Sequence, residues 1–150
     1  MPAVGWIDIV SPTLRRLHQA WCELRGPQHM AHLNDYNAFV APLDIEYAAC
    51  VLVPGDGGSP WFRHVGPRLQ PIMHGCKAGT GFHDIASQVV RAAVTAPFHR
   101  VISGRQPDCR RGQYVVLGRT QGYEQLLLPF ANNAMRVCAV QALYDMSGRH

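Results

Sequence analysis

The chain has 150 residues, of which 47% are hydrophobic and 16% are charged, and its formal net charge at pH 7 is +4. These values fit one compact domain with a substantial core and leave no room for a second domain. The charge comes from Arg residues spread along the chain, and there is no zinc-finger spacing, RNP-like segment or basic amphipathic helix, so we expect no nucleic-acid partner.

The first residues and the cysteines favour a cytoplasmic location. Residues 1–10 have neither a positively charged start nor an apolar run of signal-peptide length. No later segment reaches the length of a membrane span, so we expect no membrane partner. The cysteines are odd in number, widely spaced and without a C-x-x-C pair, which is typical of reduced thiols; they are Cys22, Cys50, Cys76, Cys109 and Cys138.

A helix is predicted from Pro12 to about Arg25. Ser11 can accept hydrogen bonds from the free N–H groups of a first turn, Pro suits the first helical position, and Gly26-Pro27 ends the helix. Such an amphipathic helix can dock on its own domain or pair with a second copy, and the pattern leaves both open. Its apolar stripe consists of Leu14, Leu17, Trp21 and Leu24.

Two strands and a helical middle are predicted next. The strands cover residues 46–53 and 61–65, and a turn rich in Gly and Pro joins them. One or two helical turns follow Gly66-Pro67. A longer helix follows, which Pro97 is expected to kink or stop and Gly104 to end. Its buried face is predicted to carry Ile85, Val89 and Ala93, with Val90 and Val94 beside them.

Three further strands are predicted at residues 112–118, 123–130 and 135–144, the last two joined by a hairpin turn at residues 131–134. This order predicts an α+β fold, in which a five-stranded antiparallel sheet has its helical middle packed over one face and an amphipathic helix at the N-terminal end. A cavity between the helices and the sheet is the expected binding site.

Five short elements, in this order along residues 14–145, resemble the PAS (Per-ARNT-Sim) domain family, and more narrowly the short stand-alone PAS proteins of alphaproteobacteria. They are W-x-x-x-R-G at Trp21 to Gly26, P-L-D-I at Pro42 to Ile45, R-x-x-G at Arg63 to Gly66, a G-x-x-x-D-[LI]-like element at Gly81 to Ile85, and E-x-L-L-L-P-[LF] at Glu124 to Phe130. Pro67 and the A-N-N-A turn at residues 131–134 depart from the family pattern.

The resemblance implies a single PAS-like domain over residues 1–150, with residues 1–27 as an N-terminal helical extension and residues 28–150 as the PAS core. It implies strands in the spatial order 2-1-5-4-3, numbered along the chain. It also implies a non-catalytic sensory module of signal transduction that binds a small ligand, a partner signalling protein, or both. It names no cofactor, because members of this fold carry haem, flavins, organic acids or nothing.

Residues from several strands and loops are candidates for the ligand site. Trp61 and Arg63 share one face of their strand and His64 the other, and the sequence leaves open which face meets the helices. By composition, Leu126 and Leu128 belong to the core. The expected ligand-binding residues are Trp61, Arg63, His64, His83, Tyr114 and Glu124.

Two alternatives to a colourless, non-catalytic module remain. A haem-binding sensor would need an axial His on the helical segment, where His83 and His99 are the best placements. A small cavity enzyme could use Glu124 with His64 or His83 as acid and base. No zinc-site spacing, nucleophile elbow or phosphate-binding loop is present in the sequence.

A homodimer is expected, because a stand-alone sensor must pass its signal to another chain. The N-terminal helix and the exposed sheet face are the expected contact surfaces. A buried aromatic residue at the centre of an interface commonly contributes about 2 kcal/mol or more. The expected interface residues are therefore Leu14, Leu17, Trp21 and Leu24.

Overall fold

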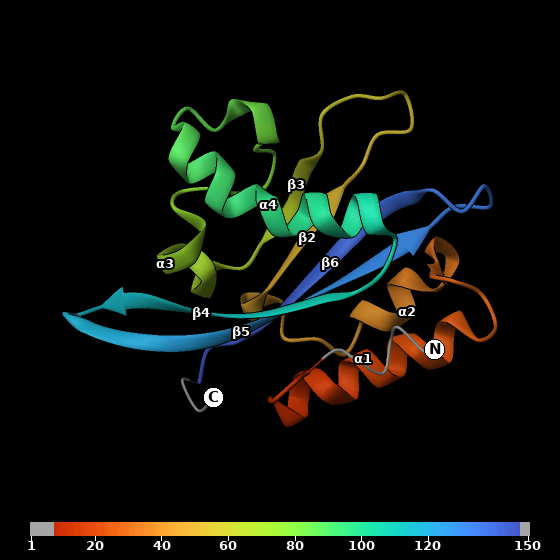
Figure 1. The fold of residues 1–150 in the computed structure, drawn as a ribbon, viewed down its shortest axis with the longest axis horizontal. Helices are drawn as coiled ribbons and strands as arrows, with labels where there is room; N and C mark the ends of the chain where they lie inside the picture. The colour runs from red at the N-terminus through yellow and green to blue at the C-terminus, as the bar shows by residue number, and fades with distance from the viewer. Residues whose placement is uncertain (1–7, 148–150) are drawn as a thin grey trace.

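The structure, a computed structural model, describes residues 8–147 (Figure 1). Its strands are β1 (Ala31–His32), β2 (Ala48–Leu52), β3 (Trp61–Val65), β4 (Asp108–Val116), β5 (Arg119–Ala131) and β6 (Val137–Asp145). They form one sheet, in which β4, β5, β6, β2 and β3 lie side by side and every one of these neighbouring pairs is antiparallel. The predicted order 2-1-5-4-3 is therefore confirmed.

The sheet has a sixth strand that the sequence did not predict. The two-residue β1 pairs in parallel with the end of β5, where Ala31 lies opposite Phe130. The strand limits also differ from the prediction: β4 starts four residues earlier than expected, at Asp108, and β5 starts at Arg119.

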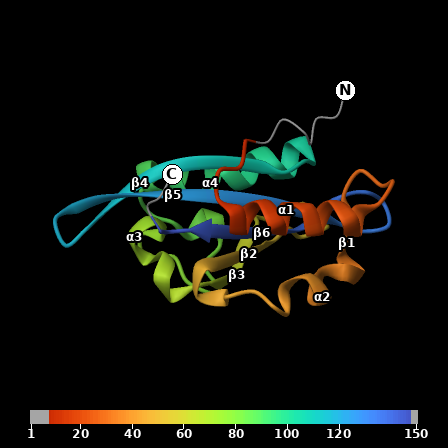
Figure 2. The ribbon, with the colours of Figure 1, turned by 90° about the horizontal axis from the view of Figure 1, so that it is seen from below.

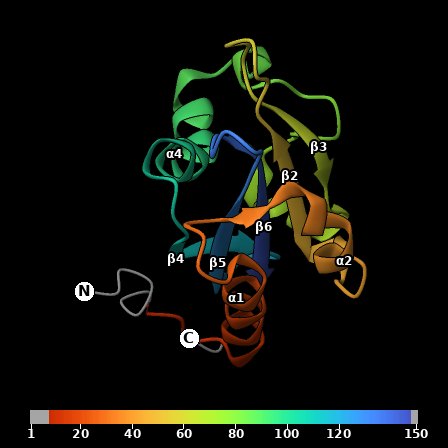
Figure 3. The ribbon, with the colours of Figure 1, turned by 90° about the vertical axis from the view of Figure 1, so that its right-hand side faces the viewer.

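Helices cover both faces of the sheet. The α-helices are α1 (Pro12–Arg25), α2 (Tyr36–Val40), α3 (Gln70–Met73) and α4 (Gln88–Gly104), and α2 and α4 lie on opposite sides of the sheet (Figure 3). Glu124 and Phe130 share one face of β5 because side chains alternate along a strand. Glu124 accepts a hydrogen bond from the backbone N–H of Ser11 at the start of α1, and the ring of Phe130 packs against Tyr36 of α2. Both helices therefore cover the same face of the sheet.

An aromatic cluster fills the space between α4 and the sheet. The rings of Phe62, Phe82 and Phe98 lie with centroids 5.5 to 5.9 Å apart, and all three side chains are buried. The face of α4 that packs here is spaced i, i+4, i+7 and carries Val94, Phe98 and Val101. This face is displaced towards the C-terminal half of α4 from the one predicted.

The predicted burial of Val89 and Ala93 is wrong. Val89 is 81% exposed and Ala93 is exposed, because α4 begins only at Gln88 and its first turns do not reach the core. Pro97 does not stop the helix, which continues to Gly104 as the sequence pattern allowed.

A two-stranded ribbon projects from the sheet (Figures 1 and 2). Within the described residues β6 ends at Asp145, opposite Glu124, whereas β4 and β5 remain paired as far as Val116 opposite Arg119. We call the projecting part, Gly112–Val116 with Arg119–Tyr123, the ribbon. No helix among residues 8–147 combines the length and apolar character that a membrane crossing requires.

Candidate functional site

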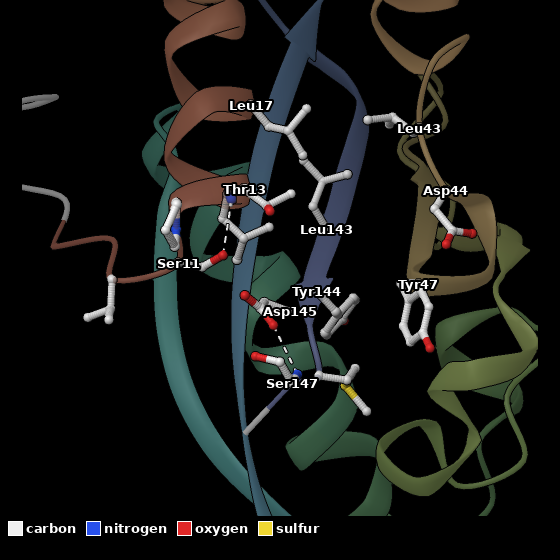
Figure 4. Close-up of a pocket in the computed structure, with 14 residues that line it drawn as sticks. Ser11, Thr13, Leu17, Leu43, Asp44, Tyr47, Leu143, Tyr144, Asp145 and Ser147 are labelled. Atoms are coloured by element: carbon white, nitrogen blue, oxygen red, sulfur yellow. Dashed lines mark hydrogen bonds between the residues drawn. The ribbon is translucent and has the colours of Figure 1, made fainter. Parts of the chain in front are cut away.

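A groove with a volume of about 630 Å³ lies between α1 and the segment that precedes β2, over the end of β6 (Figure 4). We call it the α1 groove. Side chains from both walls point towards its centre, Leu17 from α1 and Leu43 from the opposite segment (Figure 4). It is lined by Val10, Ser11, Pro12, Thr13, Leu14, Leu17, Leu43, Asp44, Tyr47, Leu143, Tyr144, Asp145, Met146 and Ser147.

The helix that forms one wall is capped at both ends as predicted. Ser11 Oγ accepts a hydrogen bond from Leu14 N at 3.2 Å, and Pro12 occupies the first helical position. At the other end Gly26 adopts a φ of 54°, which lets the chain leave the helix at little steric cost. Trp21 Nε1 donates to Pro129 O at 2.9 Å and so fixes α1 to β5.

Glu124 holds the start of α1 on the sheet. The backbone N–H groups of Ser11 and Val10 donate to its two carboxylate oxygens at 2.7 and 2.8 Å, and Arg111 Nη1 donates at 3.1 Å. The Glu124 side chain is fully buried, so these partners replace its water shell. Cys109 Sγ also donates to Glu124, and burial together with the adjacent carboxylate raises the pKa of this thiol to about 12.

The opposite wall and the floor give the groove its polarity. Asp44 Oδ1 accepts a hydrogen bond from Glu46 N at 3.1 Å, which holds the short 3₁₀ turn that presents Tyr47. Leu143 of β6 forms the floor, and Asp145 lies beside it (Figure 4). Among residues 8–147 the lining therefore combines an apolar floor with two carboxylates, several hydroxyl groups and no Lys, Arg or His. This composition suits a ligand with an apolar body and hydrogen-bonding or cationic edges.

The stripe of α1 expected to form a dimer interface divides into two parts. Leu14 and Trp21 are buried in their own chain, so they are not available to a second chain in this arrangement. Leu17 is half-buried and lines the α1 groove, and Leu24 is 36% exposed. The surface that α1 offers to another chain is therefore smaller than the stripe suggests.

The structure does not bring the six expected ligand-binding residues together, and none lines the α1 groove. Trp61 and Arg63 are exposed on β3, and His64 Nε2 lies 2.7 Å from Ile45 O. Tyr114 lies on the ribbon, where its hydroxyl donates to Gln121 Oε1 at 3.1 Å. His83 is exposed in a 3₁₀ turn beside Asp84.

The acid–base pair considered from the sequence is also not assembled. Glu124 lies on the α1 face and bonds backbone groups and Arg111, whereas His83 lies in the segment next to α4. His99, the other haem candidate, is exposed and packs edge-on against Phe82. Within residues 8–147 no three His, Cys, Asp or Glu side chains are grouped to hold a metal ion.

The expected cavity between the helical middle and the sheet is occupied by the phenylalanine cluster. A second hollow of about 640 Å³ lies at the surface between the end of α3 and the start of α4, where Lys77, Thr80 and Ser87 are part of its lining. The α1 groove was missed because its walls come from residues 10–17, 43–47 and 143–147, each of which has an unremarkable sequence pattern. Only the apolar stripe that contains Leu17 could have indicated from the sequence that α1 lines a binding groove.

The antiparallel strand order, with α4 packed over one face of the sheet, decides the fold. The fold is PAS-like. No family model and no curated protein sequence matches the chain. Among solved structures it is similar to the PAS domain of Bordetella pertussis BvgS, at 16% identity and a TM-score of 0.42 over 76% of this chain and 86% of that one. It is also similar to a sensory box histidine kinase/response regulator from Burkholderia thailandensis, at 13% identity and a TM-score of 0.35 over 76% and 85%.

Proposed function

We propose that this PAS-like chain is a non-catalytic sensory or regulatory module of the cytoplasm that binds a small molecule in the α1 groove. The ligand class is a molecule with an apolar body and a cationic or hydrogen-bonding edge. The fold supports a sensory role by analogy alone, so the proposal depends on the groove itself.

The observation that carries the proposal is the position of the groove. Its lining includes the first turns of α1 and the last residues of β6, so one ligand contacts the two ends of the described chain together. A ligand that prefers one placement of α1 shifts the population of that placement by its difference in affinity. The groove therefore offers a direct route from ligand binding to a change in how α1 lies on the sheet.

Native mass spectrometry of the purified protein tests for a co-purified small molecule. A panel of hydrophobic amines and amino-acid derivatives, screened by thermal shift, tests the proposed ligand class. Leu17→Trp fills the groove and should abolish the binding found in either experiment. Val89→Trp places the same side chain on an exposed position of α4 and should leave it intact.

Two results count against this function. Binding that survives Leu17→Trp places the ligand elsewhere. If native mass spectrometry finds no co-purified small molecule and no compound of the panel shifts the unfolding temperature, the proposed function is wrong.

A further inference from the structure

The tip of the ribbon carries exposed apolar side chains. Val115, Val116 and Leu117 are 66%, 38% and 97% exposed. Successive strand residues point to opposite faces, so Val115 and Val116 make the tip apolar on both sides of the ribbon. We call Val115–Arg119 the ribbon tip. A tip with apolar side chains on both faces and at its apex suits insertion into a groove better than contact across one flat face.

The turn at the tip is made by an unusual residue. Leu117 and Gly118 have φ values of 51° and 73°, as in a two-residue hairpin turn with both central residues in the left-handed region. Asn, Asp or Gly is usual at the first of these positions, because they tolerate that backbone and are at ease in water. Leu117 satisfies neither condition, so stability of the turn does not explain its presence.

The ribbon tip is held away from the groove of its own chain. The end of β6, which forms the groove floor, lies at the base of the ribbon, since Asp145 is opposite Glu124. The ribbon extends five paired residues beyond this base, which is roughly 17 Å of extended strand. Antiparallel pairing of β4 with β5 continues to Val116 opposite Arg119 and holds the tip at this distance, so a ribbon tip in the groove has to come from another molecule.

Charge and polarity match between the two surfaces. Within residues 8–147 the lining of the α1 groove combines apolar side chains with the carboxylate of Asp44 and includes no basic residue. The ribbon tip is apolar and ends in Arg119, which is exposed and makes no ion pair within residues 8–147. An Arg that enters beside a carboxylate gains a charge-assisted hydrogen bond while its neighbours bury apolar surface.

We infer that the ribbon tip of one copy of this chain seats in the α1 groove of a second copy. When two ribbons lie side by side in opposite directions, each tip meets the base of the other ribbon, where the groove lies. Both grooves are then filled by one twofold symmetric contact that closes on itself and does not propagate. The inference uses the groove of the proposed function, but it assigns to it a different occupant.

Sedimentation velocity at micromolar concentration tests the dimer. The wild type should be dimeric, and Leu117→Asp should weaken association by about tenfold or more, because it removes a buried leucine and adds a charge next to Asp44. Val89→Asp, an equally drastic change at an exposed site on α4, should stay dimeric. A monomeric wild type, or a dimer that Leu117→Asp leaves unchanged, overturns the inference.

A charge exchange tests the pairing of tip with groove. Arg119→Asp and Asp44→Arg should each be monomeric, since each places like charges together in both contacts of the dimer. An equimolar mixture of the two should form heterodimers, because one contact is then the original pair and the other is the reversed pair. Native mass spectrometry distinguishes these species. A mixture that stays monomeric although both variants are folded by circular dichroism overturns the inference.

The two proposals fail separately. A monomeric wild type that still binds a small molecule, with binding lost in Leu17→Trp, refutes the dimer and leaves the proposed function standing. A dimer that passes the charge exchange but binds no small molecule refutes only the ligand.

Discussion

Glu124 shows how a residue with a functional pattern can serve the fold. Its position in the E-x-L-L-L-P-[LF] element made it a candidate ligand residue and a candidate for acid–base chemistry. The structure assigns the carboxylate to the N–H groups of Val10 and Ser11 and to Arg111. The partner could not be identified from sequence, because these residues lie 13 to 114 positions away.

We predict that Glu124→Gln lowers the free energy of unfolding by about 2 kcal/mol or more. The amide cannot accept both backbone N–H groups as a carboxylate does, and a buried polar group that loses partners costs about 1–3 kcal/mol, more when it is charged. Urea unfolding at neutral pH measures the change. Glu46→Gln is the matched control, because Glu46 pairs with Arg68 in water and should change stability by less than about 1 kcal/mol. Equal effects at the two positions would contradict the role given to Glu124.

We predict that His18 makes the stability of the folded chain sensitive to acid. Its ring stacks beside Trp21, and burial together with the nearby Arg25 lowers its pKa from the ordinary value of 6.5. The unfolded chain therefore binds a proton more readily than the folded one, so stability falls as pH falls from 6.5 towards the lowered pKa and levels off below it. The wild type should lose more stability than His18→Gln when urea unfolding is repeated at decreasing pH below 6.5. Parallel pH profiles for the two proteins would show that His18 does not contribute.

At the scale of elements, capping and turn residues in the sequence correctly predicted where α1 and β3 begin and end. The cap at Ser11-Pro12 and the stop at Gly26 gave both ends of α1, and the Gly- and Pro-rich turns at residues 54–60 and 66–67 gave both ends of β3. The ribbon was only partly predicted, because its residues are exposed on both faces and therefore show no alternation of apolar and polar side chains. The buried face of α4 was displaced for a different reason: periodicity finds an apolar face, but tertiary contacts decide which turns reach the sheet.

The ribbon turn gives a prediction at this scale. Leu117→Asn should raise the free energy of unfolding by about 1 kcal/mol, because a leucine in the left-handed region costs roughly 1–2 kcal/mol that Asn largely avoids. The same change should weaken dimerisation, since the apolar apex is lost. Thermal unfolding at a concentration where both proteins are monomeric separates the two effects. A destabilised Asn variant under those conditions would contradict the strain assigned to Leu117.

At the scale of the whole molecule, the α1 groove exists only because three distant segments meet. The types of the lining residues did not indicate a groove. In the sequence Leu17 looked like a core or interface residue, and Leu143 looked like an ordinary strand residue. The strand order could be predicted because the resemblance to the PAS family implies it. The meeting of α1 with the end of β6 depends instead on buried partners such as Glu124 and Pro129. A groove lined by such segments is visible only in three dimensions.

The last prediction concerns the division of the chain into an extension, residues 1–27, and a core, residues 28–150. We predict that a chain truncated to residues 28–150 does not fold cooperatively, because it lacks the buried Leu14 and Trp21 and uncovers the face of β5 that carries Glu124. Two buried side chains of this size contribute about 5 kcal/mol together, which is comparable to the whole stability of many small domains. Near-ultraviolet circular dichroism and urea unfolding compare the truncated and full chains. Trp21→Ala in the full chain provides a milder test and should cost about 3–5 kcal/mol while the fold persists. A truncated chain that unfolds cooperatively with the stability of the full chain would instead make α1 a separable extension, free to move when the groove is occupied.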